Sequence, residues 1–402
     1  MAKIVLLSLP AYGHVNPELP IVAELVRRGH VVVVCNDGEF EGLFRAVGAA
    51  FVPYPPAMSL ADLTDALARG NLIAGFDLIL RAAGPLLDFC LAELPRLQPD
   101  VLVFDATCLW GEMAAKKLKL RSVSISPFFV FELMRHLIGP AELWGHSRNF
   151  LPGMHLLVRD WFRLTRFGVG NFPLHSPMFP MRGDRTLLLT SRELHPASPL
   201  FDNPNFVFVG PSIDPATRTD SFDFARLDGR PLIYISLGTL HYANDRFFVE
   251  AMAALADYPA QFLLSAGRGS DTGRFRDVPA NFVVEETLPQ LAVLERASLF
   301  VTHAGLNSMH EALWYGVPMV IVPQQFEQLR NALTAKQGGA AIVLDDECFG
   351  RPVGGPALRL AIEQVSATPG YRASAKALGR SLHEAGGFRA AASQIEAVAA
   401  GK

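Results

Sequence analysis

The stretch Val301–Gln328, VTHAGLNSMHEALWYGVPMVIVPQQFEQ, places polar residues on an otherwise apolar strand–helix–strand unit. The apolar runs 297–301 and 319–322 predict two buried strands. Between them the spacing predicts a helix that is capped by Asn307 or Ser308. Such a unit points the unpaired N–H groups of the helix N-terminus beyond the strand ends, which favours an anionic ligand.

Each polar residue of this stretch also has a structural interpretation. Ser308 and Glu311 have the spacing of a capping box, in which Glu311 only satisfies the backbone at the helix start. A histidine such as His303 at the end of a buried strand is more often a hydrogen-bonded structural residue than a ligand contact. The residues alone leave both interpretations open.

The whole stretch resembles the donor-binding signature of family 1 glycosyltransferases, in particular the bacterial macrolide and flavonoid enzymes. The resemblance implies that the donor diphosphate, ribose and sugar contact this stretch. The residues that carry it are His303, Gly305, Asn307, Ser308, Glu311, Gly316, Val317, Pro318, Pro323, Gln324, Glu327 and Gln328.

The implied fold is α/β of the GT-B type, with two Rossmann-like doubly wound domains facing a cleft. A length of 402 residues is ample for two domains of ordinary size. We expect an acceptor-binding domain over 1–211, a linker over 212–230 and a nucleotide-sugar-binding domain over 231–370. By resemblance, the segment 371–402 returns as a helix to the first domain.

Composition excludes several other functions. The net charge of −3 and the absence of a dense Lys/Arg cluster argue against nucleic-acid binding. Four widely spaced cysteines suggest neither a zinc site nor a disulfide framework. The short apolar run at the N-terminus predicts a first strand rather than a signal peptide, and no run is long enough to span a bilayer. We therefore expect a cytoplasmic protein that is a monomer or a weak homodimer.

His14 is the first candidate for catalysis. It lies between a predicted strand and a helix expected over 17–28, with Asn16 as its cap. The positive end of the helix helps to keep an imidazole neutral and basic there. A loop histidine that bonds its own turn is the simpler alternative. Asp105 ends another predicted strand, where it could also cap the next helix. The resemblance implies that His14 is the general base and that Asp105 orients it.

An irregular aromatic region follows, from 123 to 179. By itself it predicts mostly core, but in similar enzymes this region forms the acceptor site, where aromatic walls suit flat or polycyclic molecules. We expect four residues nearest the acceptor: Phe128, Phe129, Met134 and Trp144.

The second domain opens with Ser236-Leu237-Gly238-Thr239, which resembles a loop that holds the nucleotide diphosphate. Glycine admits a close backbone approach, and the hydroxyls of Ser236 and Thr239 can donate to phosphate. Leu288 and Gln290 lie where similar enzymes read the base. Thr287 replaces the tryptophan that often stacks on the base there, which leaves uridine and thymidine nucleotides both open.

The resemblance implies an inverting glycosyltransferase that moves a sugar, expected to be glucose, from a UDP- or dTDP-sugar to a hydroxyl of a hydrophobic small molecule. The nucleotide sugar is a co-substrate, and no further cofactor is expected. No D-x-D triplet occurs, so no metal site is expected and helix N-termini would stabilise the leaving diphosphate. The alternatives are a non-catalytic nucleotide-sugar-binding auxiliary protein and a GT-B-fold sugar-nucleotide epimerase.

Overall fold

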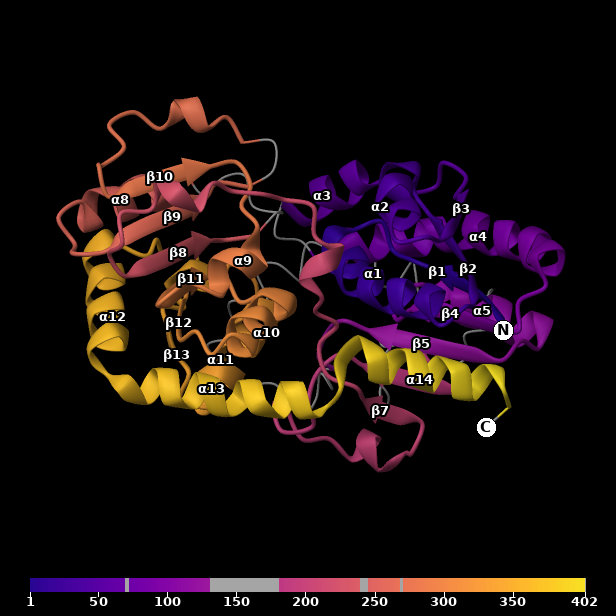
Figure 1. Ribbon diagram of the computed structural model, residues 1–402. Helices are drawn as coiled ribbons and strands as arrows, with labels where there is room; N and C mark the ends of the chain where they lie inside the picture. Colours follow the sequence, from indigo (N-terminus) through magenta and orange to yellow (C-terminus); the bar gives the residue numbers. More distant parts are fainter. Residues whose placement is uncertain (69–71, 131–180, 239–244, 268–269, 402) are drawn as a thin grey trace. The chain divides into compact units, whose positions relative to one another are not determined.

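The computed structural model describes residues 1–68, 72–130, 181–238, 245–267 and 270–401. Its internal contacts divide the chain into two compact units. Unit 1 consists of Met1–Ser191, Ala197–Ile213 and Ala385–Lys402. Unit 2 consists of Arg192–Pro196 and Asp214–Glu384. Each unit is built on its own parallel sheet with helices on its faces (Figure 1).

Unit 1 contains a seven-stranded parallel sheet in the order β3-β2-β1-β4-β5-β6-β7. Helices connect β1 to β2, β2 to β3, β3 to β4 and β4 to β5, as is usual for crossover connections between parallel strands. The strands are β1 (Lys3–Leu7), β2 (Val31–Asn36), β3 (Ala50–Pro53), β4 (Val101–Asp105), β5 (Ser122–Ser126), β6 (Arg185–Leu188) and β7 (Phe206–Phe208). The helices are α1 (Tyr12–Arg27), α2 (Glu41–Ala46), α3 (Leu60–Ala68), α4 (Leu72–Leu97), α5 (Leu109–Leu118) and α14 (Gly387–Ala399).

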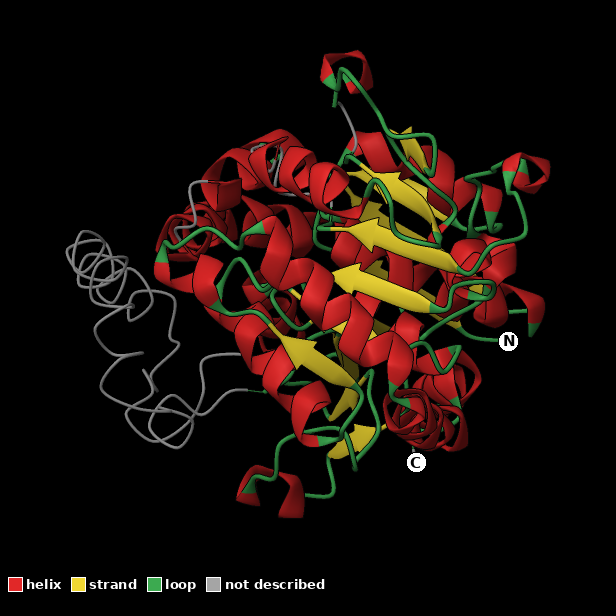
Figure 2. Cartoon of the chain, turned by 90° about the vertical axis from the view of Figure 1, so that its left-hand side faces the viewer, coloured by secondary structure: helices red, strands yellow, loops and turns green. Residues whose placement is uncertain are grey.

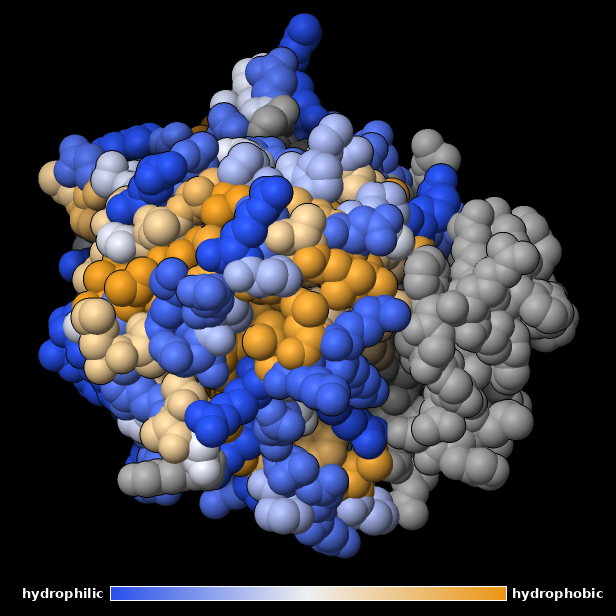
Figure 3. All heavy atoms as spheres, turned by 90° about the vertical axis from the view of Figure 1, so that its right-hand side faces the viewer, coloured by the Kyte–Doolittle hydropathy of each residue, from blue (hydrophilic) through white to orange (hydrophobic). Residues whose placement is uncertain are grey.

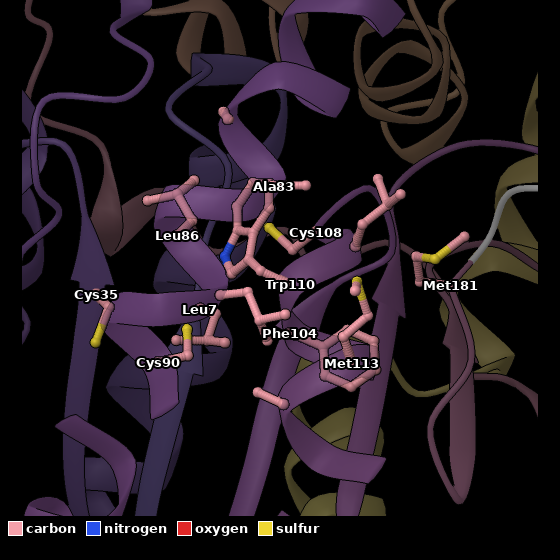
Figure 4. Packing of buried hydrophobic residues seen from close by; sticks show 14 of the residues in the cluster. Leu7, Cys35, Ala83, Leu86, Cys90, Phe104, Cys108, Trp110, Met113 and Met181 are labelled. Carbon is pink, nitrogen blue, oxygen red and sulfur yellow. The ribbon is translucent and has the colours of Figure 1, made fainter. Parts of the chain in front are cut away.

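Alternate residues of β1 enter two different cores, because successive side chains of a strand point to opposite faces. Val5 and Leu7 pack into the core beneath α4 and α5. Ile4 and Leu6 pack into the core beneath α1 and α14. Figure 4 shows the first of these cores, in which sulfur and aromatic side chains from several elements surround Leu7. The sheet of unit 1 is therefore covered by helices on both faces.

Unit 2 repeats the plan with a six-stranded parallel sheet in the order β10-β9-β8-β11-β12-β13. The arrows of its strands run in one direction (Figure 2). The strands are β8 (Leu232–Ser236), β9 (Gln261–Ser265), β10 (Phe282–Glu285), β11 (Leu299–Thr302), β12 (Met319–Ile321) and β13 (Ala341–Val343). The helices are α8 (Asp245–Leu255), α9 (Gln290–Leu294), α10 (Leu306–Trp314), α11 (Phe326–Gln337), α12 (Gly355–Ala367) and α13 (Pro369–Glu384).

Most of the large apolar side chains among the described residues are buried. Apolar residues do reach the surface between hydrophilic ones, as the side of the molecule in Figure 3 shows. Within the described ranges, the most exposed large apolar side chains are Met1, Val31, Val249, Val278 and Leu360. No helix in the described ranges is both long and apolar enough to cross a bilayer.

Two predicted helix starts were wrong. Helix α1 begins at Tyr12, so Pro17 lies inside it and His14 belongs to its first turn. Pro17 resembled a first helical residue because its fixed φ suits that position, but it is the sixth residue of α1, where a proline leaves one backbone carbonyl without its helical hydrogen bond. Helix α10 begins directly after Gly305, and neither Asn307 nor Ser308 caps it.

The strand β5 was also missed, because its sequence SVSIS was taken as the start of the irregular region. All five of its residues are buried. The serines tolerate burial through hydrogen bonds to backbone carbonyls: the Ser124 hydroxyl donates to Met181, and the Ser126 hydroxyl donates to Phe128.

Ion pairs hold α14 against α1 in unit 1. The Arg28 guanidinium lies 2.8 Å from Glu24 and 2.6 Å from Glu396. Glu396 also accepts a hydrogen bond from Nε2 of His30, and Nδ1 of His30 accepts one from the backbone N–H of Ala2. His30 thus links the N-terminus of the chain to α14 through both of its ring nitrogens.

In unit 2 the His303 ring packs against two glycines. A Cβ atom at Gly238 would lie 2.6 Å from Cε1 of His303, and one at Gly305 would lie 2.7 Å from its Nε2. Gly238 also has a φ of +85°, a left-handed conformation that side chains disfavour. The loop after β8 can therefore approach the His303 ring because Gly238 lacks a side chain, and Gly305 leaves room for the same ring within the loop after β11.

We predict that Glu24→Gln destabilises the protein in a pH-dependent manner. Hydrogen bonds from Arg27, and then Arg28, lower the pKa of Glu24 to about 2 from its ordinary 4.5. The carboxylate therefore stabilises the fold above pH 4.5, and this stabilisation disappears as the pH falls through 2. Urea unfolding should show a loss of about 2 kcal/mol at pH 7 that shrinks below pH 4. A difference independent of pH would contradict this assignment.

We predict that Gly238→Ala destabilises unit 2 more than Gly229→Ala does. The two glycines have nearly equal φ values, +85° and +86°, but a Cβ at Gly229 would meet nothing within 4 Å. Gly229→Ala should thus cost only about 1–2 kcal/mol of backbone strain. Gly238→Ala should cost roughly 1–3 kcal/mol more, because it also displaces His303. Equal losses in denaturant unfolding would show that the imidazole moves freely.

Candidate functional site

In unit 1 the structure brings together His14 and Asp105. His14 lies in the first turn of α1, which follows β1, and Asp105 is the last residue of β4. Because β1 and β4 are neighbouring parallel strands, both residues reach the same carboxyl edge of the sheet. Nδ1 of His14 lies 2.7 Å from Oδ2 of Asp105. The Asp105 side chain is 1% exposed and that of His14 is 20% exposed.

The remaining oxygen of Asp105 is held by Thr107. Oδ1 accepts hydrogen bonds from the Thr107 backbone N–H, at 2.7 Å, and from its hydroxyl. The residue that caps α5 is Cys108, so Asp105 is not the cap of that helix. A carboxylate fixed in this way keeps the proton of a neutral imidazole on Nδ1 and leaves Nε2 as the basic atom.

The predicted acceptor residues fall partly within the described residues. The Phe128 ring lies beside the His14 ring, with 6.4 Å between the ring centroids. Phe129 is completely buried. Met134 and Trp144 lie outside the described residues.

In unit 2 a polar network surrounds Glu311 on α10. Its Oε1 lies 2.8 Å from the Arg218 guanidinium, and its Oε2 accepts a hydrogen bond of 2.5 Å from the Gln290 amide. The same amide contacts the Ser308 hydroxyl at 3.2 Å. The capping-box interpretation of Glu311 is therefore wrong: its carboxylate faces Arg218 and Gln290, and the cap position has no side-chain hydrogen bond. Leu288, two residues before Gln290, is buried.

The other predicted donor residues lie at the ends of β8 and β11. Ser236 is the last residue of β8, and its hydroxyl accepts from the Gly238 N–H at 3.4 Å. Thr239 lies outside the described residues. His303, Gly305 and Asn307 form the turn into α10 and its first residues.

Within that turn Ala304 has a φ of +63° although it is not glycine. Backbone strain of this kind often occurs at functional sites.

Glu327 and Gln328 lie in the first turn of α11. One oxygen of Glu327 accepts a hydrogen bond from Asn331 at 2.8 Å, and Asn331 also donates to the Ala304 carbonyl. The carbonyl oxygen of Gln328 accepts from the backbone N–H groups of Gln324 and Gln325, which caps α11. Gln328 is thus a structural cap through one end of its amide.

Arg218 belongs to the polar network around Glu311, and the sequence did not indicate this contact. It lies in a stretch that was interpreted as a linker because it lacks an apolar period. Only the fold shows that this arginine pairs with the carboxylate of Glu311, whose side chain is 5% exposed. Among the described residues, no group of three or more His, Cys, Asp or Glu side chains has the arrangement of a metal site.

Comparison with known proteins agrees with this arrangement. The family described as UDP-glucoronosyl and UDP-glucosyl transferase matches residues 197–385. The NDP-glycosyltransferase YjiC of Bacillus subtilis is 30% identical over 98% of this chain and 96% of its own. The oleandomycin glycosyltransferase of Streptomyces antibioticus is 29% identical over 82% of this chain and 76% of its own.

A solved structure matches this chain over nearly its whole length. The crystal structure of the glycotransferase of kitacinnamycin is 29% identical, has a TM-score of 0.83, and covers 99% of both chains. The two parallel-sheet units are the Rossmann-like domains of the GT-B fold. Fold, sequence similarity and the family match together establish that this chain belongs to the family 1 glycosyltransferases.

Proposed function

We propose that this glycosyltransferase moves a glucosyl group from a UDP- or dTDP-sugar to a hydroxyl of an apolar natural product, with inversion at the anomeric carbon. The observation that carries the proposal is the His14–Asp105 pair, because a deprotonated Nε2 is what activation of a hydroxyl requires. The names of similar proteins, which include an oleandomycin glycosyltransferase and a kitacinnamycin enzyme, support a natural-product acceptor.

In the proposed reaction, Nε2 of His14 takes the proton of the acceptor hydroxyl as its oxygen attacks the anomeric carbon. The bond between that carbon and the diphosphate oxygen breaks, and the nucleoside diphosphate leaves. Asp105 balances the positive charge that develops on the imidazole. The Phe128 ring beside His14 supports an apolar acceptor.

Unit 2 is the proposed donor site. Ser236, Gly238, Thr239, His303, Gly305, Asn307 and Ser308 would hold the diphosphate, with Leu288 and Gln290 near the base. The N-terminus of α10 offers N–H groups to the diphosphate oxygens. Glu311 would bind the ribose hydroxyls, and Glu327 with the amide nitrogen of Gln328 would bind the sugar. The Arg218 and Gln290 contacts hold the Glu311 carboxylate in one orientation before the nucleotide arrives.

The test is a transfer assay with UDP-glucose or dTDP-glucose and a panel of macrolides and flavonoids, followed by mass spectrometry. We expect an acceptor to gain the mass of one hexose residue. Measurable nucleotide binding with no product from any donor would overturn the proposal and favour the auxiliary-protein hypothesis. Incubation with donor alone tests the epimerase hypothesis, since only an epimerase converts the donor into an isomer.

We predict that His14→Ala reduces transfer by about 10²–10⁴-fold, the usual contribution of a general base. Nucleotide affinity, measured by calorimetry, should stay within about twofold of wild type, because His14 belongs to unit 1 and the proposed donor residues belong to unit 2. Asp105→Asn should lower transfer while it preserves nucleotide binding. Parallel losses of transfer and binding in His14→Ala would contradict the assignment.

We predict that Glu311→Gln weakens UDP or dTDP binding roughly 10- to 150-fold, since hydrogen bonds to a charged group contribute about 1.5–3 kcal/mol. Glu285→Gln is the matched control, because Glu285 also pairs with an arginine in unit 2, at 2.6 Å, but the pair is more exposed. Calorimetric titration should show unchanged affinity for the control. Equal affinities in both variants would remove Glu311 from the donor site.

A further inference from the structure

Glu18 is a buried carboxyl group that the proposed reaction does not use. It lies on α1 four residues after His14, and residues at this spacing share one face of a helix. The residue is 1% exposed. Neither carboxyl oxygen has a hydrogen-bond partner of normal geometry among the described residues. A charge in such a place would be strongly destabilising.

The surroundings of Glu18 offer little solvation. It lines a cavity of about 10 Å³, the lower limit for one water molecule. The other lining residues are all apolar: Ile4, Leu6, Ile21, Val22, Leu25, Val32, Val103, Ile125 and Ile395. A water there would find at most one polar side chain instead of the usual two to four partners, so the cavity does not stabilise a carboxylate.

The ionisable groups that act on Glu18 strengthen this effect. Burial first, and then the Asp105 carboxylate, raise the pKa of Glu18 well above its ordinary value. The Ser8 hydroxyl opposes the rise, but it contributes less than the other two. Glu18 in turn helps to raise the pKa of Cys108, whose thiol is neutral in any case. The neutral acid is therefore the favoured form of Glu18 in the folded protein.

An apolar side chain would occupy this position at lower energy, and a violation of that kind is expected mainly at functional sites. We propose that Glu18 is a positioning residue for the transfer reaction, held as a neutral carboxylic acid so that it adds no second negative charge to that of Asp105 at the His14 ring. The proposal rests on the proposed role of His14 as the base. Loss of the Glu18 proton would create a second negative charge that repels Asp105 in a region with little water, and this repulsion would disturb the His14–Asp105 contact.

The first test measures stability and needs no substrate. Unfolding by urea is compared for wild type and Glu18→Gln from pH 4.5 to 9. The unfolded wild-type chain releases the Glu18 proton above pH 4.5, whereas the folded chain keeps it, so rising pH destabilises wild type. The ratio of the two unfolding constants should therefore change by up to tenfold per pH unit in favour of the variant.

The variant Asp105→Asn tests whether the Asp105 charge helps to keep Glu18 neutral. In that background the ratio should stop changing at a lower pH, because one of the two causes of Glu18 neutrality is removed. Glu24→Gln is a matched control on the same helix with the opposite sign, since ion pairs lower the pKa of Glu24 to about 2. If the ratio of the unfolding constants of wild type and Glu18→Gln does not vary with pH, the proposal is overturned.

The second test observes the His14–Asp105 pair directly. ¹⁵N NMR of the His14 imidazole in the substrate-free protein should show an alkaline change in wild type that Glu18→Gln lacks, and the alkaline fall of kcat/KM should disappear in the same variant. Superimposable NMR titrations would overturn the proposal and leave Glu18 a structural residue. Absence of transfer with every donor would overturn the proposed function instead, since neither the unfolding nor the NMR measurement depends on a substrate.

Discussion

The burial of the Asp105 carboxylate is the constraint on which the candidate site of unit 1 depends. A carboxylate with 1% exposure is stable only if both oxygens have partners. Thr107 supplies the partners for one oxygen and His14 supplies the partner for the other. The order β1-β4 within the sheet makes this possible, since it places the start of α1 beside the end of β4. The imidazole is thus oriented by the same contact that makes the carboxylate tolerable.

In unit 2 the buried carboxylate is that of Glu311. Its carboxylate is buried on α10 and is compensated by Arg218 and Gln290, which come from segments distant in sequence. The His303 ring is fixed from two sides by the positions of Gly238 and Gly305. Both units therefore keep the polar groups of the strand ends in place through packing and hydrogen bonds within the unit.

The sequence was sufficient for the general architecture and for motif residues, but not for contacts across distant segments. Runs such as VVVVC in β2 predicted buried strands because their composition is unambiguous. The strand β5 was missed because its serines are satisfied only in the folded sheet. Arg218 and Glu18 carry no local signal at all: the role of the first depends on the position of Glu311, and that of the second on the cavity beside α1.

Glu18 and Glu24 show why residue type alone could not reveal these roles. Both are glutamates on α1, and both are almost completely buried. Glu24 points to Arg27 and Arg28, so its charge is compensated and stabilises the attachment of α14. Glu18 faces apolar side chains and Asp105, so the same charge would be repelled. On the same helix, Glu24 is therefore an anion that stabilises the fold, whereas Glu18 is a neutral acid in the proposed role at the His14–Asp105 pair.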